Sequence, residues 1–129
     1  MKDQFVTYEI AKRLKDLGFN EPCFGWYRSG LLRCIDSGIE LPFDYTSNTL
    51  INEREEAERI EGIAAPLWQQ AHGWLREKHG VFISILPDFE RFEVSAFRGE
   101  DVWKSTCGSY DKARVQGVEL GLKMVEDPV

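Results

Sequence analysis

The sequence lacks the features that mark several large classes of protein. No apolar run approaches the roughly 18 residues of a membrane-spanning helix, so we expect no integral membrane protein. Neither GxGxxG nor GxxxxGKS/T occurs, and a common nucleotide-binding loop is therefore unsupported. Basic residues are outnumbered by acidic ones, 16 against 22, and the net charge is −6. This balance argues against a protein whose main task is to hold a phosphate backbone, which requires local positive charge.

Cysteine is also scarce. Cys23, Cys34 and Cys107 are odd in number, widely spaced and include no CxxC pair. This pattern predicts reduced thiols in a cytoplasmic protein, and no apolar export signal follows the start MKDQF. A disulfide between Cys23 and Cys34 is the alternative if their strands pair, although the cytoplasm disfavours it.

The chain of 129 residues, 43% of them hydrophobic, is long enough to bury one core, and we expect a single α+β domain over 1–129. Apolar spacing predicts helices at 6–17, at 66–79 and after Ser109, and strands at 23–27, 31–35, 81–86, 89–97 and 102–106. The order is α-β-β-loop-α-β-β-β-α. It predicts an antiparallel sheet, made of a β-hairpin and a three-strand meander, with about three helices on one face.

Individual residues set the expected boundaries. Thr7 is placed to cap the first helix, and Pro66 to occupy the first position of the second. Pro87–Asp88 is expected to form the turn before the strand that begins at Phe89. Gly73, inside a helix, indicates a close backbone approach there.

The segment 36–62 differs from the rest of the chain. It has little periodicity and is too long for a passive connection, which indicates a functional or mobile loop or appendage. It holds eight acidic and two basic residues, so it accounts for the whole net charge of −6. A short helix over 53–61 is one expectation within it. The densest carboxylates, which suit docking onto a basic surface, are Glu53, Glu55, Glu56 and Glu58.

The sequence indicates no catalytic residue, no metal site and no cofactor. His72 and His79 are seven positions apart on one predicted helix, whereas zinc ligands on a helix are usually three or four apart. Nothing marks a nucleophile with a neighbouring base. A small enzyme with a non-local Cys/His or carboxylate site is therefore only the third hypothesis.

Aromatic residues give the richest binding signal. The candidate set is Trp26, Tyr27, Trp68, His72 and Trp103. Core filling is the first explanation, because large aromatic side chains dominate ordinary cores. The functional alternative is that these residues line a groove or an oligomer contact, where Trp and Tyr are favoured.

Two stretches carry a resemblance to a known group of proteins. They are TYEIAKRLKDLGFNEPCFGWY at 7–27 and APLWQQAHGWLREKHG at 65–80, followed by a final helix that starts at Tyr110-Asp111-Lys112-Ala113. In these stretches the chain resembles small uncharacterised proteins encoded by bacteriophages and prophages of gut bacteria. The resemblance covers nearly the whole chain except the acidic segment. It implies a phage or mobile-element origin and transfers no catalytic residue.

Two further resemblances concern the order of elements. Residues 66–125 have the α-β-β-β-α order of a double-stranded-RNA-binding domain, and Gly108–Arg114 is similar to the start of that family's last helix, with Lys112 and Arg114 as its basic residues. From Ile83 onward the layout is similar to antitoxin domains of the HicB type. Both imply a nucleic-acid-associated regulator, although the order of elements does not by itself define function.

The sequence therefore predicts an accessory protein of phage or prophage type, located in the cytoplasm of the host bacterium. We expect it to act as a non-catalytic protein-binding module. Its partner is expected to be a protein, namely a second copy, a host protein or a phage protein. Nucleic acid is the alternative partner, and no membrane is expected.

Overall fold

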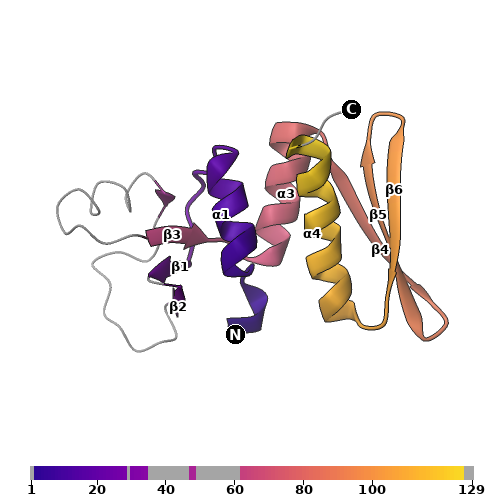
Figure 1. Ribbon diagram of the computed structural model, residues 1–129, viewed down its shortest axis with the longest axis horizontal. Coiled ribbons are helices and arrows are strands. Elements are labelled where there is room, and N and C mark those ends of the chain that lie inside the picture. Colours follow the sequence, from indigo (N-terminus) through magenta and orange to yellow (C-terminus); the bar gives the residue numbers. More distant parts are fainter. Residues whose placement is uncertain (1, 29, 35–46, 49–61, 127–129) are drawn as a thin grey trace. The chain divides into compact units, whose positions relative to one another are not determined.

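The computed structural model of the chain describes residues 2–28, 30–34, 47–48 and 62–126. Contacts divide the chain into two compact units, Met1–Leu67 and Trp68–Val129, and each is described by itself. Each unit has a three-stranded antiparallel sheet with helical elements, so the predicted α+β class is confirmed (Figure 1). The single domain stays a prediction. The acidic segment, apart from residues 47, 48 and 62, and the helix expected at 53–61 lie outside the described residues.

The first unit begins with a short 3-10 helix, η1 (Lys2–Gln4), and helix α1 (Tyr8–Asp16). The predicted cap is confirmed, because the Thr7 hydroxyl accepts a hydrogen bond from the Ile10 N–H at 3.4 Å. Gly18, with φ 96°, follows the end of the helix. The buried face of α1 consists of Ile10, Ala11 and Leu14.

The sheet of the first unit has the order β2-β1-β3. Its strands are β1 (Gly25–Arg28), β2 (Leu31–Cys34) and β3 (Gly62–Ala65), and β1 is antiparallel to both neighbours. The β1–β2 hairpin agrees with the sequence prediction. Strand β3 is not predicted, because all four of its residues are buried and its sequence shows no alternation of polar and apolar residues. Helix α1 packs against β3.

Pro66 does not begin the next helix, so that predicted boundary is wrong. The Val6 N–H donates to the Pro66 carbonyl oxygen at 3.0 Å, and Phe5 forms an isolated antiparallel bridge with Leu67. These contacts hold residues 66–67 alongside residues 5–6. The helix therefore begins only at Trp68.

Asn48 links two parts of the first unit from a position where only 4% of its surface is exposed. Its Nδ2 donates to the Phe19 carbonyl oxygen at 2.8 Å, and its Oδ1 accepts from the Ala64 N–H at 2.9 Å. One side-chain amide therefore satisfies an acceptor just after α1 and a donor in β3.

The second unit has the order α-β-β-β-α. It consists of α3 (Trp68–His79), β4 (Phe82–Asp88), β5 (Arg91–Arg98), β6 (Asp101–Cys107) and α4 (Tyr110–Glu126). The strands form the predicted antiparallel meander, β4-β5-β6. Helix α4 packs on all three strands, and α3 packs on α4 and β4, so both helices lie on one face of the sheet (Figure 1). Ser109 caps α4 as predicted, since its Oγ accepts from the Lys112 N–H at 3.2 Å.

Two glycines bring α4 close to the sheet. A Cβ atom at Gly117 would lie 2.7 Å from Cγ2 of Ile83, and one at Gly121 would lie 3.2 Å from Cγ1 of Val81. The glycines are four positions apart and therefore share one face of the helix. The close approach expected at Gly73 is wrong, because the nearest atom to a Cβ there, Nη2 of Arg76, is 4.0 Å away.

Gly117→Ala is expected to destabilise the protein, because the added methyl group overlaps Ile83. We expect the free energy of unfolding, measured by urea denaturation, to fall by about 1–3 kcal/mol. Gly73→Ala is the matched control, since it fills open space in a helix interior and should raise stability by about 0.5–1 kcal/mol. Effects of the same sign in the two variants would contradict the close approach at Gly117.

Asn48→Ala is expected to lower the free energy of unfolding by about 2–4 kcal/mol, because a buried donor and a buried acceptor lose their partner. Asn48→Asp should cost at least as much, since an ionised carboxylate cannot donate to the Phe19 carbonyl oxygen. Chemical denaturation measures both losses. The exposed amide of Gln69 provides the control, and Gln69→Ala should change stability by less than about 0.5 kcal/mol. A comparable effect of Asn48→Ala and Gln69→Ala would refute the role of Asn48.

Candidate binding surface

The predicted binding residues lie in both units. Trp26 and Tyr27 are on β1, whereas Trp68 and His72 are on α3 and Trp103 is on β6. We therefore consider each group within its own unit. The acidic candidates Glu53, Glu55, Glu56 and Glu58 lie outside the described residues.

Tyr27 contributes to the packing of the first unit. Its hydroxyl donates to the Val6 carbonyl oxygen at 2.7 Å, and its ring meets the Tyr8 ring edge-on, with centroids 5.5 Å apart. Burial raises the pKa of Tyr27. Trp26 is half-buried and, as the next residue along the strand, faces the opposite side of the sheet. Tyr27 therefore ties residues 6–8 to β1.

Trp68 lies in a cluster around Arg114, near the start of α4. The Arg114 guanidinium carbon lies 5.9 Å from the centre of the Trp68 ring and 5.4 Å from that of Tyr110. Its Nη2 donates to Oδ1 of Asp111 at 2.8 Å, and only 11% of the side chain is exposed. Two aromatic rings and a carboxylate therefore stabilise the cation within the unit. Of the two basic residues named for the RNA-binding resemblance, Lys112 is exposed and Arg114 is not.

His72 is half-buried beside the same arginine. Burial lowers its pKa, a backbone hydrogen bond at Arg114 raises it, and the Arg114 charge lowers it. Within the part of the chain that the structure describes, Nε2 of His72 has no hydrogen-bond partner. The cluster thus keeps this imidazole in its neutral form near pH 7.

The sheet of the second unit has two unequal faces. Ile83 and Val94 contact α4 at Gly117, and strand alternation places Ala96 and Trp103 on that same inner face. We call the opposite side the outer face. It comprises Phe82, Ser84, Leu86, Asp88, Arg91, Glu93, Ser95, Phe97, Val102, Lys104 and Thr106.

An apolar row crosses the outer face. Phe82 pairs with Phe97, and Phe97 pairs with Val102, so the three side chains lie next to one another on adjacent strands. Phe82 is 55% exposed and Val102 is 45% exposed, and Leu86 on the same face of β4 is 58% exposed. Sequence analysis misses this row. The run Val81–Leu86 is almost wholly apolar, so its sequence does not show which of its residues face solvent and which face the core.

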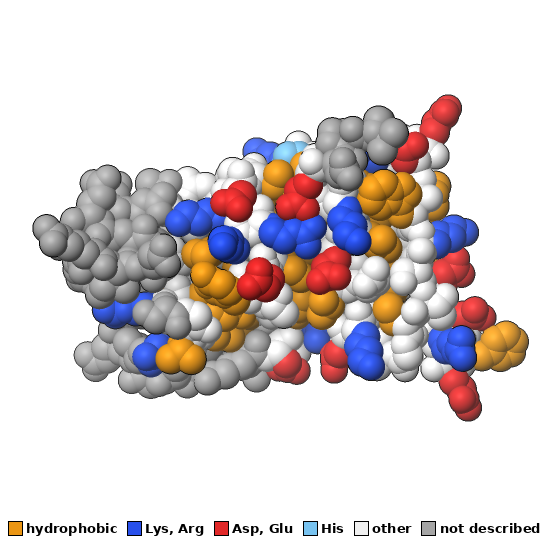
Figure 2. Space-filling view, in the orientation of Figure 1, with side chains coloured by type: hydrophobic (Ala, Val, Ile, Leu, Met, Phe, Trp, Pro, Cys, Tyr) orange, Lys and Arg blue, Asp and Glu red, His pale blue; other side chains and the backbone are white. Residues whose placement is uncertain are grey.

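The charges of the outer face balance. Asp88 and Glu93 are matched by Arg91 and Lys104, and Oε1 of Glu93 lies 3.4 Å from Nζ of Lys104. On the side of the molecule seen in Figure 2, basic and acidic side chains are likewise interspersed. An exposed apolar row with balanced charge suits a protein partner better than a phosphate backbone.

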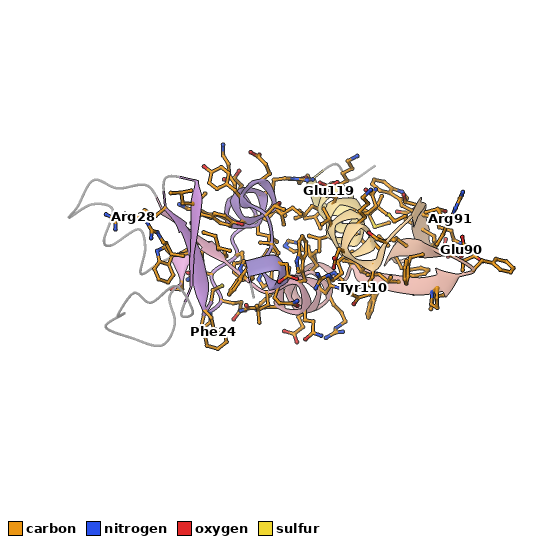
Figure 3. The ribbon with its side chains drawn as sticks, turned by 90° about the horizontal axis from the view of Figure 1, so that it is seen from below. Phe24, Arg28, Glu90, Arg91, Tyr110 and Glu119 are labelled. Carbon is orange, nitrogen blue, oxygen red and sulfur yellow. The ribbon has the colours of Figure 1, made fainter. Side chains whose placement is uncertain are left out.

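The β4–β5 turn lies two residues later than predicted. Strand β4 continues through Pro87 and Asp88, and Asp88 pairs with Arg91, so the loop is Phe89–Glu90. Pro87 is tolerated because β4 is an edge strand. Phe89 is fully exposed, at 102%, and has a positive φ of 57°. Figure 3 shows Glu90 and Arg91 at this far end of the sheet.

Two of the three cysteines, Cys23 and Cys107, have free thiols. Burial raises the pKa of Cys23 to about 12, which makes it a poor nucleophile.

The residues described include no group of three or more His, Cys, Asp or Glu side chains suited to a metal ion. None of the described helices is both long enough and apolar enough to span a membrane.

The chain matches no protein-family model, no curated protein and no solved structure. The outer face and the Phe89 hairpin are therefore interpreted from their own residues.

The pH dependence of stability is expected to reflect His72. Because its pKa in the folded protein lies below the ordinary value of 6.5, the unfolded chain takes up a proton first as the pH falls. The free energy of unfolding should therefore decrease as the pH falls from 6.5 towards the lowered pKa, and it should be unaffected by this group well above 6.5.

Denaturation curves of His72→Gln between pH 8 and pH 5 test this expectation, and the variant should show a flatter profile. His79→Gln is the control. The pKa of His79 is also lowered, by partial burial and the Arg98 charge, but its side chain is less buried and should contribute less. A His72→Gln profile as steep as that of the unaltered protein would contradict the assignment.

Proposed function

We propose that this chain is a non-catalytic protein-binding module that engages its partner through the outer face of the β4–β6 sheet. The observation that carries the proposal is the apolar row of Phe82, Phe97 and Val102, in which Phe82 and Val102 are exposed, together with exposed Leu86 four residues along β4 on the same face. Large apolar side chains that gather on one exposed face are typical of interaction sites. In this proposal the chain is an accessory protein of phage or prophage type and acts in the cytoplasm of the host bacterium.

The fold supports such a surface mechanically. Helices α3 and α4 pack against the inner face of the sheet, so the strands that carry the outer side chains are held in place by a close-packed core. Covering the exposed parts of Phe82, Leu86 and Val102 would contribute about 2–4 kcal/mol in total, at the usual values for apolar burial. That gain alone gives weak binding, so we expect further polar contacts from the Glu93–Lys104 pair on the same face.

A nucleic-acid-associated regulator is the second candidate. The α-β-β-β-α order of the second unit favours it, since that is the order of a double-stranded-RNA-binding domain. Two observations weigh on the other side. Arg114 is paired within the unit, and the outer face carries no excess of positive charge. We therefore place protein binding first.

Site-specific photo-crosslinking tests the proposed surface. The full chain, carrying p-benzoylphenylalanine in place of Phe82, is produced in cells of the organism that encodes it and then irradiated. We expect one stoichiometric adduct with a single identified protein. The same probe in place of Phe24 is the matched control, because Phe24 is a similarly exposed phenylalanine, at 48%, in the first unit. Figure 3 marks its position.

The adduct must also depend on the apolar row. The double variant Phe82→Ser, Val102→Thr should weaken binding of the purified partner at least about tenfold, while its unfolding transition stays close to that of the unaltered chain. Equal adducts at positions 24 and 82, or no adduct at 82, would refute the outer face as the binding surface. Salt-dependent retention of a short RNA duplex at low ionic strength would replace protein binding by the second candidate.

A further inference from the structure

The β4–β5 loop places a phenylalanine where the backbone favours glycine. The loop has two residues, Phe89 and Glu90, between the paired residues Asp88 and Arg91. Only the first of the two has a positive φ, at 57°, which is the sign pattern of a type II′ turn. In such a turn glycine is preferred at the first position, because a side chain there is crowded by its own backbone.

The same sheet contains its own reference for this turn. The β5–β6 loop, Gly99–Glu100, also has two residues, and its first residue has φ 61°. Here the residue at the strained position is glycine. The two hairpins thus share loop length and backbone sign, and they differ in that one carries a phenyl ring.

Phe89 is unfavourable for folding in two independent ways. Its backbone conformation is strained for a bulky residue, and its ring is entirely in water, with 102% of its surface exposed. Glycine at this position would remove both penalties without disturbing the Asp88–Arg91 pair. Strained residues that do not stabilise the fold are often found at functional sites, which indicates that Phe89 takes part in binding.

We infer that Phe89 is an anchor residue, whose ring inserts into an apolar pocket of a partner protein that has basic side chains at its rim. The inference rests on the proposed function and adds the chemistry of the partner. Asp88 and Glu90 flank Phe89 in the sequence and outnumber Arg91, so residues 88–91 carry a net negative charge. This charge complements a basic rim and disfavours an anionic lipid surface.

The anchor is continuous with the outer face. Leu86 lies on edge strand β4, three residues before Phe89 in the sequence. It belongs to the outer face and is 58% exposed. A partner pocket that receives the ring is therefore within reach of Leu86 as well. Ring insertion at the tip and apolar contact along β4 then belong to one interface.

The first step of the test is photo-crosslinking of the full chain with p-benzoylphenylalanine at position 89. The matched control carries the probe in place of Glu100, an exposed residue in the neighbouring two-residue loop. We expect an adduct at 89 and none at 100, and we expect the crosslinked peptide of the partner to be apolar and bordered by Lys or Arg. The absence of an adduct at 89, or equal adducts at both positions, overturns the inference.

The second step separates binding from folding. Phe89→Gly should raise the midpoint of thermal unfolding by about 3 °C, because the strain is relieved, yet weaken binding of the identified partner at least about tenfold. Phe89→Asn tolerates the positive φ but lacks the ring, and should weaken binding similarly. Phe89→Tyr keeps the ring and should retain the affinity within about threefold. Unchanged affinity of Phe89→Gly overturns the inference, as does cosedimentation with phosphatidylglycerol vesicles that depends on Phe89.

The two proposals fail in different ways. An adduct at position 82 without one at 89 leaves the outer face as the binding surface and removes the anchor. Adducts at 89 alone retain the anchor and remove the apolar row from the interface.

Discussion

The close approach of α4 to the β4–β6 sheet is the constraint on which the second unit depends. Gly117 and Gly121 let the helix backbone come near Ile83 and Val81. A Cβ atom at position 117 would overlap Ile83, and one at position 121 would be in tight contact with Val81. With α4 this near, the inner face is filled and becomes the core. The other face is left with Phe82 and its neighbours in water. The contact that builds the core thus also produces the surface that we assign to binding.

Much of the fold follows from patterns that are local in the sequence. The caps Thr7 and Ser109 bond within one turn of their helices, and the strands of the meander pair across loops of only two residues. Strand β3 and the start of α3 are different, because both depend on contacts with distant residues. β3 is buried throughout, which removes its alternation, and Pro66 is held by Val6 instead of opening the helix.

The candidate site is less predictable, for a physical reason. Which side of β4 meets water depends on where α4 packs, and an almost wholly apolar run does not contain that information. Phe89 is missed because Pro-Asp is the more usual turn pair and phenylalanine is disfavoured at positive φ. The pairing of Asp88 with Arg91 overrides both preferences. Of the aromatic set, Trp68 and His72 are found together beside Arg114 only once α3 packs on α4.

The strand order β2-β1-β3 has a consequence for the way the chain acquires its structure. Strand β1 pairs with β2, which follows it closely in the sequence, and the strands of the meander also pair in sequence order, so these pairs form from neighbouring residues. Strand β1 meets β3 only when residues 34 to 40 positions apart in the sequence come together, which costs entropy before any contact repays it. During synthesis from the amino terminus, the edge of β1 that pairs with β3 therefore has no partner strand until Ala65 has been added. In that interval this edge of β1 is open to mispairing with another chain.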